Sequence, residues 1–569
     1  MFFLVMGLRR QLLCLSLLLA CLPAAAQRYC RKVPVILAEF ADEPFTVSKE
    51  HADSILRVTE SYFYDQLGPN DSIKFTLGPV VSLPSRQDGS NVALAVSEAC
   101  RLADPEFNFS RFAARGSNKL NCVCVVFSGS RIWPRQYSLS EENVFLSLDG
   151  KEIDGYMAIP EIFEDTVFET GLLCHEYGHV LGLSDYYDTD GEGSGGLAQC
   201  LWGSISPMDS GFKNNNSRTP AGFGAPEYHE LGLGICDTLK RGRINLEPVS
   251  VNRRYLWYPA DVPGEYWLFE CRTQSGWDEF IGGSGLLIYH VDKSKNRAGF
   301  STYYNITLTA EQRWERKQVN CRPDHQCMDL VEAFPGADSV NAVFFPFSEG
   351  QVFASETDPE FRAWSGKASN LAIRDIKVEA DSSVSFTVIE PIRNGKEYVF
   401  QTSATICWEL DESLLEETDS CVVSWLRDGV EIVREQIGAG KTGKAYHTLD
   451  GLEPGTHYNI VFSIYTKATV YSLDRHITTL NKDSRNTIPF IFLGGAERND
   501  DGSFKLGSSF PLYVYNSLGA EEIRWTFNGK EPKLNDEGLF VVEGNGTLRA
   551  EVFYEDGSCD IIAKEIIAR

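Results

Sequence analysis

The most constraining feature of the chain is the short run His175-Glu-Tyr-Gly-His179, because it indicates both a local structure and a chemistry. Two histidines four residues apart lie on one face of an α-helix, about one turn from each other. Two imidazoles so placed can share one zinc ion, with Glu176 beside the water at the metal. The alternative is a chance match, which composition puts on the order of one per cent for a chain of this length. We therefore expect a helix here and a metal centre on one of its faces.

The residues upstream predict where this helix begins. Thr166-Val-Phe-Glu169 fits a capping box, with Thr166 as the N-cap and Glu169 reaching back to it. Apolar side chains at helical spacing would bury the rest of the helix, and they are Val167, Phe168, Leu172, Leu173, Val180 and Leu181. Gly182 can adopt a positive φ and end the helix.

A third metal ligand must come from beyond the helix. If the helix continued past Gly182, residue 185 would lie roughly 15 Å from residue 175, out of reach of the metal. A turn at Gly182 instead brings Asp185 back as an oxygen ligand. His175, His179 and Asp185 with one water would then complete a tetrahedral catalytic site that has one open position.

Asp188 and Asp190 follow on the same loop and leave two alternatives open. They compete with Asp185 for the zinc if the turn is wider. They are also candidates for a separate Ca²⁺ site, since calcium takes carboxylate oxygens, although exposed acids after a turn are more often simply solvated. The alternative for Asp185 is a purely structural role, in which its carboxylate caps the turn by accepting hydrogen bonds from the backbone.

Residues 175–188 resemble the active-site segment of the immune inhibitor A family of secreted zinc metallopeptidases. That family belongs with the metzincins, so the resemblance implies an α+β, metzincin-like zinc peptidase domain. Other segments share the likeness, among them Val33–Phe40 and Gly285–Asp292. The family's helix and ligand turn are usually followed by a methionine turn, and the matching candidate is Met208, in the run Ser206-Pro-Met-Asp-Ser-Gly211.

The function implied is that of a zinc-dependent endopeptidase that hydrolyses peptide bonds in proteins, with Glu176 as general base. The rival from another class is an exported binding or adhesion protein whose peptidase-like scaffold is inactive. Intact His175, Glu176 and His179 argue against that rival. A serine hydrolase is disfavoured, because no Gly-x-Ser-x-Gly elbow lies between a strand and a helix.

The first residues of the chain are typical of a targeting signal. Two arginines at 9–10 precede an apolar run over 12–22 and then three alanines, which is the order of a secretory signal peptide. We expect residues 1–26 to be removed and the protein to be secreted, periplasmic or on the cell surface. The alternative is lipid attachment at Cys21. The apolar run is shorter than the about 20 residues of a membrane-spanning helix, and no later stretch is longer, so no transmembrane segment is expected.

The net charge limits the classes of molecule that the protein can bind, and the cysteine content limits the possible disulfides. The 53 Lys and Arg residues against 79 Asp and Glu give a formal net charge of −26, so nucleic acid and anionic membrane surfaces would be repelled. Of the 15 cysteines, Cys14 and Cys21 fall in the signal. We expect most of the other cysteines to be buried apolar residues. The alternative that one or two disulfides form is left open, without an assigned pairing.

Three regions follow the signal peptide. Residues 27–391 mix strands with helical segments and form the expected peptidase domain. Residues 392–480 alternate strands and turns, and Leu452–Tyr458 resembles the loop and tyrosine-bearing strand of a fibronectin type III sandwich. Residues 481–569 show short strands between turn signals and are expected to form a second, Ig-like β-sandwich. The two small all-β domains are expected to act as spacers or to contact a cell surface, a glycan or a protein.

Overall fold

The computed structural model describes residues 32–83, 91–114, 116–336, 339–438, 440, 443–480, 490–491, 497–498, 504–505, 509–515, 517, 520–554 and 557–566. The predicted signal peptide, with Cys21, lies outside these residues. The chain forms two compact units. One comprises Met1–Leu239, Asn245–Glu349 and Lys377–Ser385, and the other comprises Lys240–Ile244, Gly350–Ile376 and Phe386–Arg569. The units follow spatial proximity rather than chain order, so the expected domain limits at residues 391 and 480 stay a prediction.

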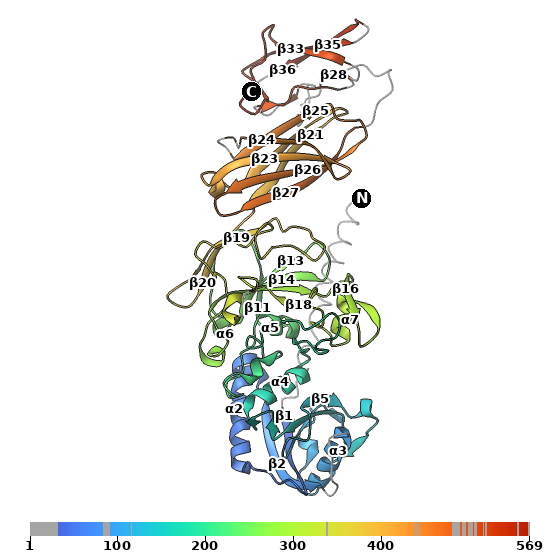
Figure 1. The fold of residues 1–569 in the computed structure, drawn as a ribbon, viewed down its shortest axis with the longest axis vertical. Coiled ribbons are helices and arrows are strands. Elements are labelled where there is room, and N and C mark those ends of the chain that lie inside the picture. Colours follow the sequence, from blue (N-terminus) through green and yellow to red (C-terminus); the bar gives the residue numbers. More distant parts are fainter. Residues whose placement is uncertain are drawn as a thin grey trace, which may run out of the picture. The chain divides into compact units, whose positions relative to one another are not determined.

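A five-stranded sheet forms the first part of the first unit (Figure 1). Its strands, in the order β2-β1-β4-β8-β5, are β2 (Lys74–Leu83), β1 (Lys32–Phe40), β4 (Val123–Phe127), β8 (Gly155–Pro160) and β5 (Arg135–Ser138). The first four are parallel to their neighbours, whereas β5 runs antiparallel to β8 at the edge of the sheet. Every residue of β4 is buried, which is typical of a strand covered on both faces.

Helices cover both faces of this sheet, and they are α2 (Lys49–Leu67), α3 (Val92–Ala103) and α4 (Thr170–Leu181). Val33, Val35 and Leu37 of β1 pack into a core shared with α2 and α4. The alternate residues Ile36 and Ala38 pack into a second core shared with α3. Since successive strand residues point to opposite faces, the two cores lie on opposite sides of the sheet. The arrangement is a mixed α and β fold, as the sequence predicts.

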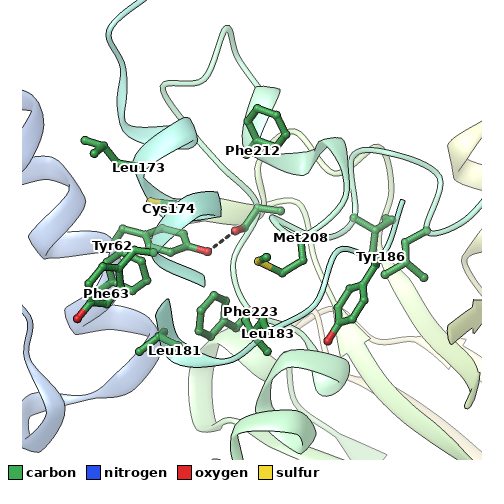
Figure 2. Packing of buried hydrophobic residues seen from close by; sticks show 14 of the residues in the cluster. Tyr62, Phe63, Leu173, Cys174, Leu181, Leu183, Tyr186, Met208, Phe212 and Phe223 are labelled. Carbon is green, nitrogen blue, oxygen red and sulfur yellow. Dashed lines mark hydrogen bonds between the residues drawn. The ribbon is translucent and has the colours of Figure 1, made fainter. Parts of the chain in front are cut away.

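Aromatic residues of the first core hold helix α4 in place (Figure 2). The Phe63 ring of α2 meets the Tyr177 ring of α4 edge to face, with centroids 5.0 Å apart. Beside it, the Tyr62 hydroxyl donates a hydrogen bond of 2.7 Å to the Ala221 carbonyl. Tyr62, Phe63 and Tyr177 are fully buried. These contacts fix the position of the helix that carries the two histidines of the motif.

A second five-stranded sheet completes the first unit. In the order β11-β13-β14-β15-β18, its strands are β11 (Ile235–Thr238), β13 (Arg254–Pro259), β14 (Glu265–Arg272), β15 (Gly285–Asp292) and β18 (Met328–Leu330). All residues of β14 and β15 are buried. Among them, the Arg272 Nε lies 2.9 Å from Oδ2 of Asp278, also buried. Removing one partner of such a buried pair costs about 3–5 kcal/mol, so the pair fixes the loop that follows β14.

The remaining elements before residue 390 are short. The helices are α5 (Ala225–Leu231), α6 (Val249–Asn252) and α7 (Ala310–Glu315). The short strands are β3 (Lys119–Leu120), β6 (Leu146–Leu148), β7 (Lys151–Ile153), β9 (Ile162–Phe163), β10 (Thr166–Val167), β16 (Arg297–Ser301) and β17 (Ile306–Thr309). A three-stranded sheet has the order β12-β20-β19, with β12 (Gly242–Leu246), β20 (Val384–Ile389) and β19 (Ala372–Val378).

The second unit contains a two-sheet β-sandwich. One sheet is β21-β22-β25, with β21 (Ile392–Val399), β22 (Ser403–Leu410) and β25 (Lys444–Asp450). The other is β24-β23-β26-β27, with β24 (Val430–Ile437), β23 (Thr418–Arg427), β26 (His457–Thr466) and β27 (Val470–Thr478). Both sheets bury aromatic residues in one core, including Trp408, Trp425 and Tyr458. The Tyr458 hydroxyl accepts from the backbone N–H of Glu453, a tyrosine-corner contact of the kind found in such sandwiches.

The described residues from 490 onward are strands and turns. The longest strands are β33 (Ala520–Phe527), β35 (Gly546–Tyr554) and β36 (Cys559–Ile566), which form an antiparallel sheet. The short strands are β28 (Phe490–Ile491), β29 (Glu497–Arg498), β30 (Phe504–Lys505), β31 (Ser509–Phe510), β32 (Val514–Tyr515) and β34 (Phe540–Val541). A small core that includes Phe510, Phe540 and Val552 joins them. The all-β character of this region agrees with the sequence, and its Ig-like topology stays a prediction.

Most cysteines in the described part of the chain are buried, as the sequence predicts. Ten of the twelve cysteines in it are buried, and no disulfide joins any two of them. No helix within the described ranges is long and apolar enough to cross a membrane.

Candidate metal centre

Helix α4 begins later than the sequence suggests. Its N-cap is Glu169, and that side chain makes no capping hydrogen bond. Thr166 and Val167 form β10, paired antiparallel with β9, so the predicted capping box is wrong. The cause is a tight hairpin through Glu164, whose φ of 52° folds the chain back and places the Thr166 backbone in a ladder. As a result Val167 is exposed rather than buried in the core.

The end of the helix lies where the sequence predicts. Gly182 has a φ of 109°, in the left-handed region that glycine adopts without a steric penalty. Its N–H donates to the carbonyls of Gly178 and His179. The chain therefore turns back at Gly182, and Asp185 returns to the face of the helix that carries His175.

The structure brings His175, His179 and Asp185 together. Oδ1 of Asp185 lies 3.3 Å from Nε2 of His175 and 3.2 Å from Nε2 of His179. One potential ligand atom from each of the three residues lies within 4.8 Å of the others. The three side chains are buried or nearly so, with exposed fractions of 6%, 12% and 16%.

Hydrogen bonds on the far side of each imidazole fix which nitrogen faces the cluster. Nδ1 of His175 lies 2.8 Å from the carbonyl oxygen of Pro207, and Nδ1 of His179 lies 2.9 Å from that of Leu183. A carbonyl only accepts, so each Nδ1 carries the hydrogen and each neutral imidazole presents a lone pair at Nε2. Both lone pairs then face Oδ1 of Asp185. Three electron-rich atoms converge there, and a cation placed between them would balance their charge.

The spacing of these atoms suits zinc. With ligand bonds of about 2.0–2.2 Å, a tetrahedral zinc ion separates its ligand atoms by roughly 3.3–3.5 Å. The observed separations of 3.2 and 3.3 Å are close to that edge length. Two imidazoles and one carboxylate are also a donor set that zinc accepts in catalytic sites. The residues therefore fit a zinc ion.

Asp185 and His175 shift each other's pKa. Burial opposes ionisation of Asp185, but its interactions with the nearby His175 and His179 side chains prevail and hold the pKa of Asp185 below its usual range. Burial also lowers the pKa of His175, yet the Asp185 and Glu176 carboxylates outweigh it, so the net shift is upward. An ionised carboxylate therefore lies close to both imidazoles.

Glu176 lies beside the cluster with one oxygen uncommitted. The residue is 3% exposed, and within the described part of the chain its Oε2 makes no hydrogen bond. Burial raises the pKa of Glu176, against the opposing effect of His175 and His179. The backbone of Gln136 in β5 also favours the ionised form of the carboxylate and lowers its pKa. A buried carboxylate with a raised pKa and a free oxygen is equipped to take up a proton.

Met208 packs directly beneath α4 (Figure 2). A Cβ at Gly178 would lie only 2.4 Å from the Met208 sulfur, so the absence of a side chain there allows the contact. The Met208 carbonyl accepts from the backbone N–H of Tyr186 at 2.8 Å, while its neighbour Pro207 accepts from His175. One short loop therefore positions a histidine of the cluster and the turn that carries Asp185.

A buried pair that sequence reasoning missed anchors this loop. Ser206 donates a hydrogen bond to Oε1 of Glu227, and its hydroxyl oxygen accepts from the Met208 N–H at 3.0 Å. Glu227 is 1% exposed, and burial raises its pKa to about 7. The two residues lie 21 positions apart, and no pattern in the sequence links a serine of the loop to a glutamate of α5.

Asp188 and Asp190 lie outside the cluster of His175 and His179. They form a separate group with Cys321. The two Asp188 oxygens accept from three backbone N–H groups of their own loop, so the side chain already has a structural role. Burial raises the pKa of the Cys321 thiol to about 11, and a neutral thiol is a poor ligand for calcium, which prefers oxygen. The calcium site that the sequence left open as one alternative has no support in this geometry.

Comparison with known families agrees with the geometry. Residues 148–227 match the catalytic-domain model of the immune inhibitor A peptidase M6 family. The resemblance predicted from residues 175–188 is thereby confirmed over this segment, which contains the His175 cluster, Glu176 and Met208. The match indicates a metallopeptidase that acts on proteins and uses a metal.

No curated protein matches the chain. Among solved structures, one match is the solution structure of a fibronectin type III domain derived from human KIAA0970 protein. It is 18% identical over 17% of this chain and 79% of that chain, with a TM-score of 0.13. Another is a two-domain fibronectin type III segment from chicken tenascin, 11% identical over 31% of this chain and 97% of that chain, with a TM-score of 0.14. At these scores neither likeness carries an argument, and the sandwich of residues 392–480 rests on its own strand order.

Proposed function

We propose that this chain is an exported, zinc-dependent endopeptidase that cleaves peptide bonds in proteins. The observation that carries the proposal is the convergence of Nε2 of His175, Nε2 of His179 and Oδ1 of Asp185, with both Nδ1 atoms committed to carbonyls. Three potential ligand atoms that converge on one point, two of them on imidazoles whose other nitrogen is committed to a carbonyl, suit a single metal ion.

The residues around the cluster have distinct roles in hydrolysis. His175, His179 and Asp185 would hold the zinc ion, which when bound supplies a Lewis acid that polarises the scissile carbonyl and acidifies water. Glu176 accepts the proton of the attacking water at its free Oε2 and then passes it to the leaving amine. Met208 supports the helix from beneath and does not touch the reacting atoms.

Strand β5 provides a place for an extended substrate. It is the edge strand of its sheet, and an edge strand presents backbone N–H and C=O groups with which an extended peptide can pair. Strand β5 contacts α4, and the backbone of its Gln136 interacts with the Glu176 carboxylate, so a peptide lying along β5 passes the general base.

Export is the second part of the proposal. It rests on the arginine pair, the apolar run and the alanines within residues 1–26. Sequencing the N-terminus of the mature protein tests it directly, because cleavage after Ala26 leaves Gln27 first. A lipid-modified Cys21 at the N-terminus would favour the anchored alternative instead.

Digestion of casein and of a peptide library by the purified full chain tests the peptidase activity. We expect internal cleavage that a chelator abolishes and zinc restores. A folded, zinc-loaded protein that cleaves none of these substrates would favour the inactive-scaffold alternative, in which the β domains carry the function.

A further inference from the structure

A row of aromatic rings leads away from the metal cluster. The Phe212 ring lies 4.7 Å from the ring of His175, measured between centroids. Phe163 of β9 follows at 6.3 Å from Phe212, and Trp133 follows at 5.4 Å from Phe163 in an edge-to-face arrangement. The four rings come from four different segments of the first unit. They form a continuous series of contacts that begins at a candidate zinc ligand.

The row changes from buried to exposed along its length. Phe212 is 7% exposed, Phe163 is partly buried and Trp133 is 72% exposed. Contiguous exposed apolar surface, unlike single exposed side chains, marks sites of interaction, and aromatic residues are enriched where proteins bind ligands. The exposed end of the row therefore presents an apolar surface connected to the cluster.

A second contact ties the exposed end to the site. Trp133 lies three residues before Gln136 of β5, a strand that contacts α4 and whose Gln136 backbone interacts with the Glu176 carboxylate. The segment that carries Trp133 therefore reaches the general base at one point and the aromatic row at another. A peptide lying along β5 would pass Trp133 close to the bond to be cleaved.

The charge beside the row is already neutralised. Nζ of Lys213 lies 5.6 Å from the ring centroids of both Phe163 and Phe212. The same Nζ forms an ion pair of 2.7 Å with Glu164. The lysine packs over the rings and its charge is balanced, so it does not offer an unpaired cation to an acidic side chain. What the row offers a ligand is its aromatic surface.

We propose that Trp133, Phe163 and Phe212 form a subsite that binds an aromatic or large aliphatic side chain of the substrate beside the scissile bond. This inference rests on the proposed peptidase function and adds a substrate class to it. Trp133 and Phe163 make the contact, and Phe212 connects the subsite to the ring of His175. A small or acidic side chain would leave the rings exposed and would bind weakly, because little apolar surface would be buried.

A peptide series tests the subsite. The peptides share one backbone and vary one position at a time next to the scissile bond among Phe, Leu, Ala and Asp. We expect the wild type to prefer Phe or Leu over Ala at one position by about 10–200-fold in kcat/KM, the range for changes in a hydrophobic pocket. Trp133→Ala should reduce that preference about tenfold or more, whereas Trp133→Phe should retain most of it.

Phe145→Ala is the matched control, because Phe145 is 77% exposed in the same unit and takes no part in the row. It should leave the preference unchanged. Binding gives a readout apart from catalysis. A Phe-containing peptide should bind the inactive Glu176→Gln protein more weakly when Trp133→Ala is added, as measured by calorimetry.

The outcomes separate the subsite from the function on which it rests. If the wild type cleaves no peptide, the proposed function fails. If it cleaves peptides but Trp133→Ala and Phe145→Ala show the same preference as the wild type, the subsite is wrong. If Trp133→Ala instead dissociates a dimer in sedimentation and leaves peptide preference unchanged, the exposed ring is an interface between copies, which also overturns the proposal.

Discussion

The imidazole of His175 donates from Nδ1 to the carbonyl oxygen of Pro207 at 2.8 Å, across 32 positions of the chain. This contact decides that Nε2 carries the lone pair and faces Asp185. The same hydrogen bond joins helix α4 to the loop that contains Met208. The Met208 carbonyl in turn accepts a hydrogen bond from the Tyr186 N–H. His175 is therefore oriented by a backbone carbonyl of this buried loop, and His179 by the Leu183 carbonyl of the turn after its helix, which is the usual way in which metal-binding histidines are held.

Glu176→Gln should abolish peptide hydrolysis while leaving the metal bound. The amide keeps the size of the side chain but lacks the basic oxygen, and general-base catalysis typically contributes 10²–10⁴-fold. The measurements are kcat on a cleaved peptide and the zinc content of the purified protein. Glu169→Gln, at the other end of the same helix, is the control and should stay active. Near-wild-type turnover in zinc-loaded Glu176→Gln would contradict the assigned role.

Gly178→Ala should destabilise the protein, although alanine is ordinarily the better helix former by up to about 1 kcal/mol. The new Cβ would lie 2.4 Å from the sulfur of the fully buried Met208, and overpacking of this kind costs about 1–3 kcal/mol. Urea denaturation measures the change in the free energy of unfolding. The same substitution made in a Met208→Ala background should cost less, because the clashing sulfur is gone. An equal cost in both backgrounds would show that Met208 does not pack against Gly178.

Glu227 should make stability depend on pH near neutrality. Burial raises its pKa in the folded protein to about 7, from an ordinary value of 4.5. The folded state therefore holds the proton more tightly than the unfolded state. The stabilising contribution is fully present below about pH 4.5 and is lost as the pH rises through 7, by roughly 3 kcal/mol in total. Glu227→Gln should flatten this part of the profile of unfolding free energy against pH. An unchanged profile would mean that Glu227 stays ionised in the folded protein.

The local parts of the site could be predicted from sequence, because they depend on residues close together in the chain. The spacing of His175 and His179, the glycine at 182 and the return of Asp185 all follow from helix geometry. The start of the helix could not be predicted in the same way. Thr166 fits a capping box, but a strand partner competes for the same backbone, and only the paired β9 shows which of the two prevails.

Contacts between segments that are far apart in the chain could not be predicted from the sequence. Ser206 with Glu227 and Phe163 with Trp133 are brought together by the packing of separate elements, and no spacing rule connects them. The strand order of the two sheets is likewise a tertiary result. Met208 is an intermediate case, since the family resemblance named it and the structure shows what it contacts.

Zinc affinity in a set of aspartate variants tests whether His175, His179 and Asp185 form the zinc site. Asp185 contacts both histidines, whereas Asp188 accepts hydrogen bonds within its own loop. Competition with a graded chelator measures the affinity of the full chain and of Asp185→Ala, Asp188→Ala and Asp190→Ala. We expect Asp185→Ala to lose more than the 10–100-fold typical of an outer-shell partner, and the other two to stay near the wild type. Unchanged zinc affinity in Asp185→Ala, or a larger loss in Asp188→Ala, would contradict the assignment of His175, His179 and Asp185 as the zinc site.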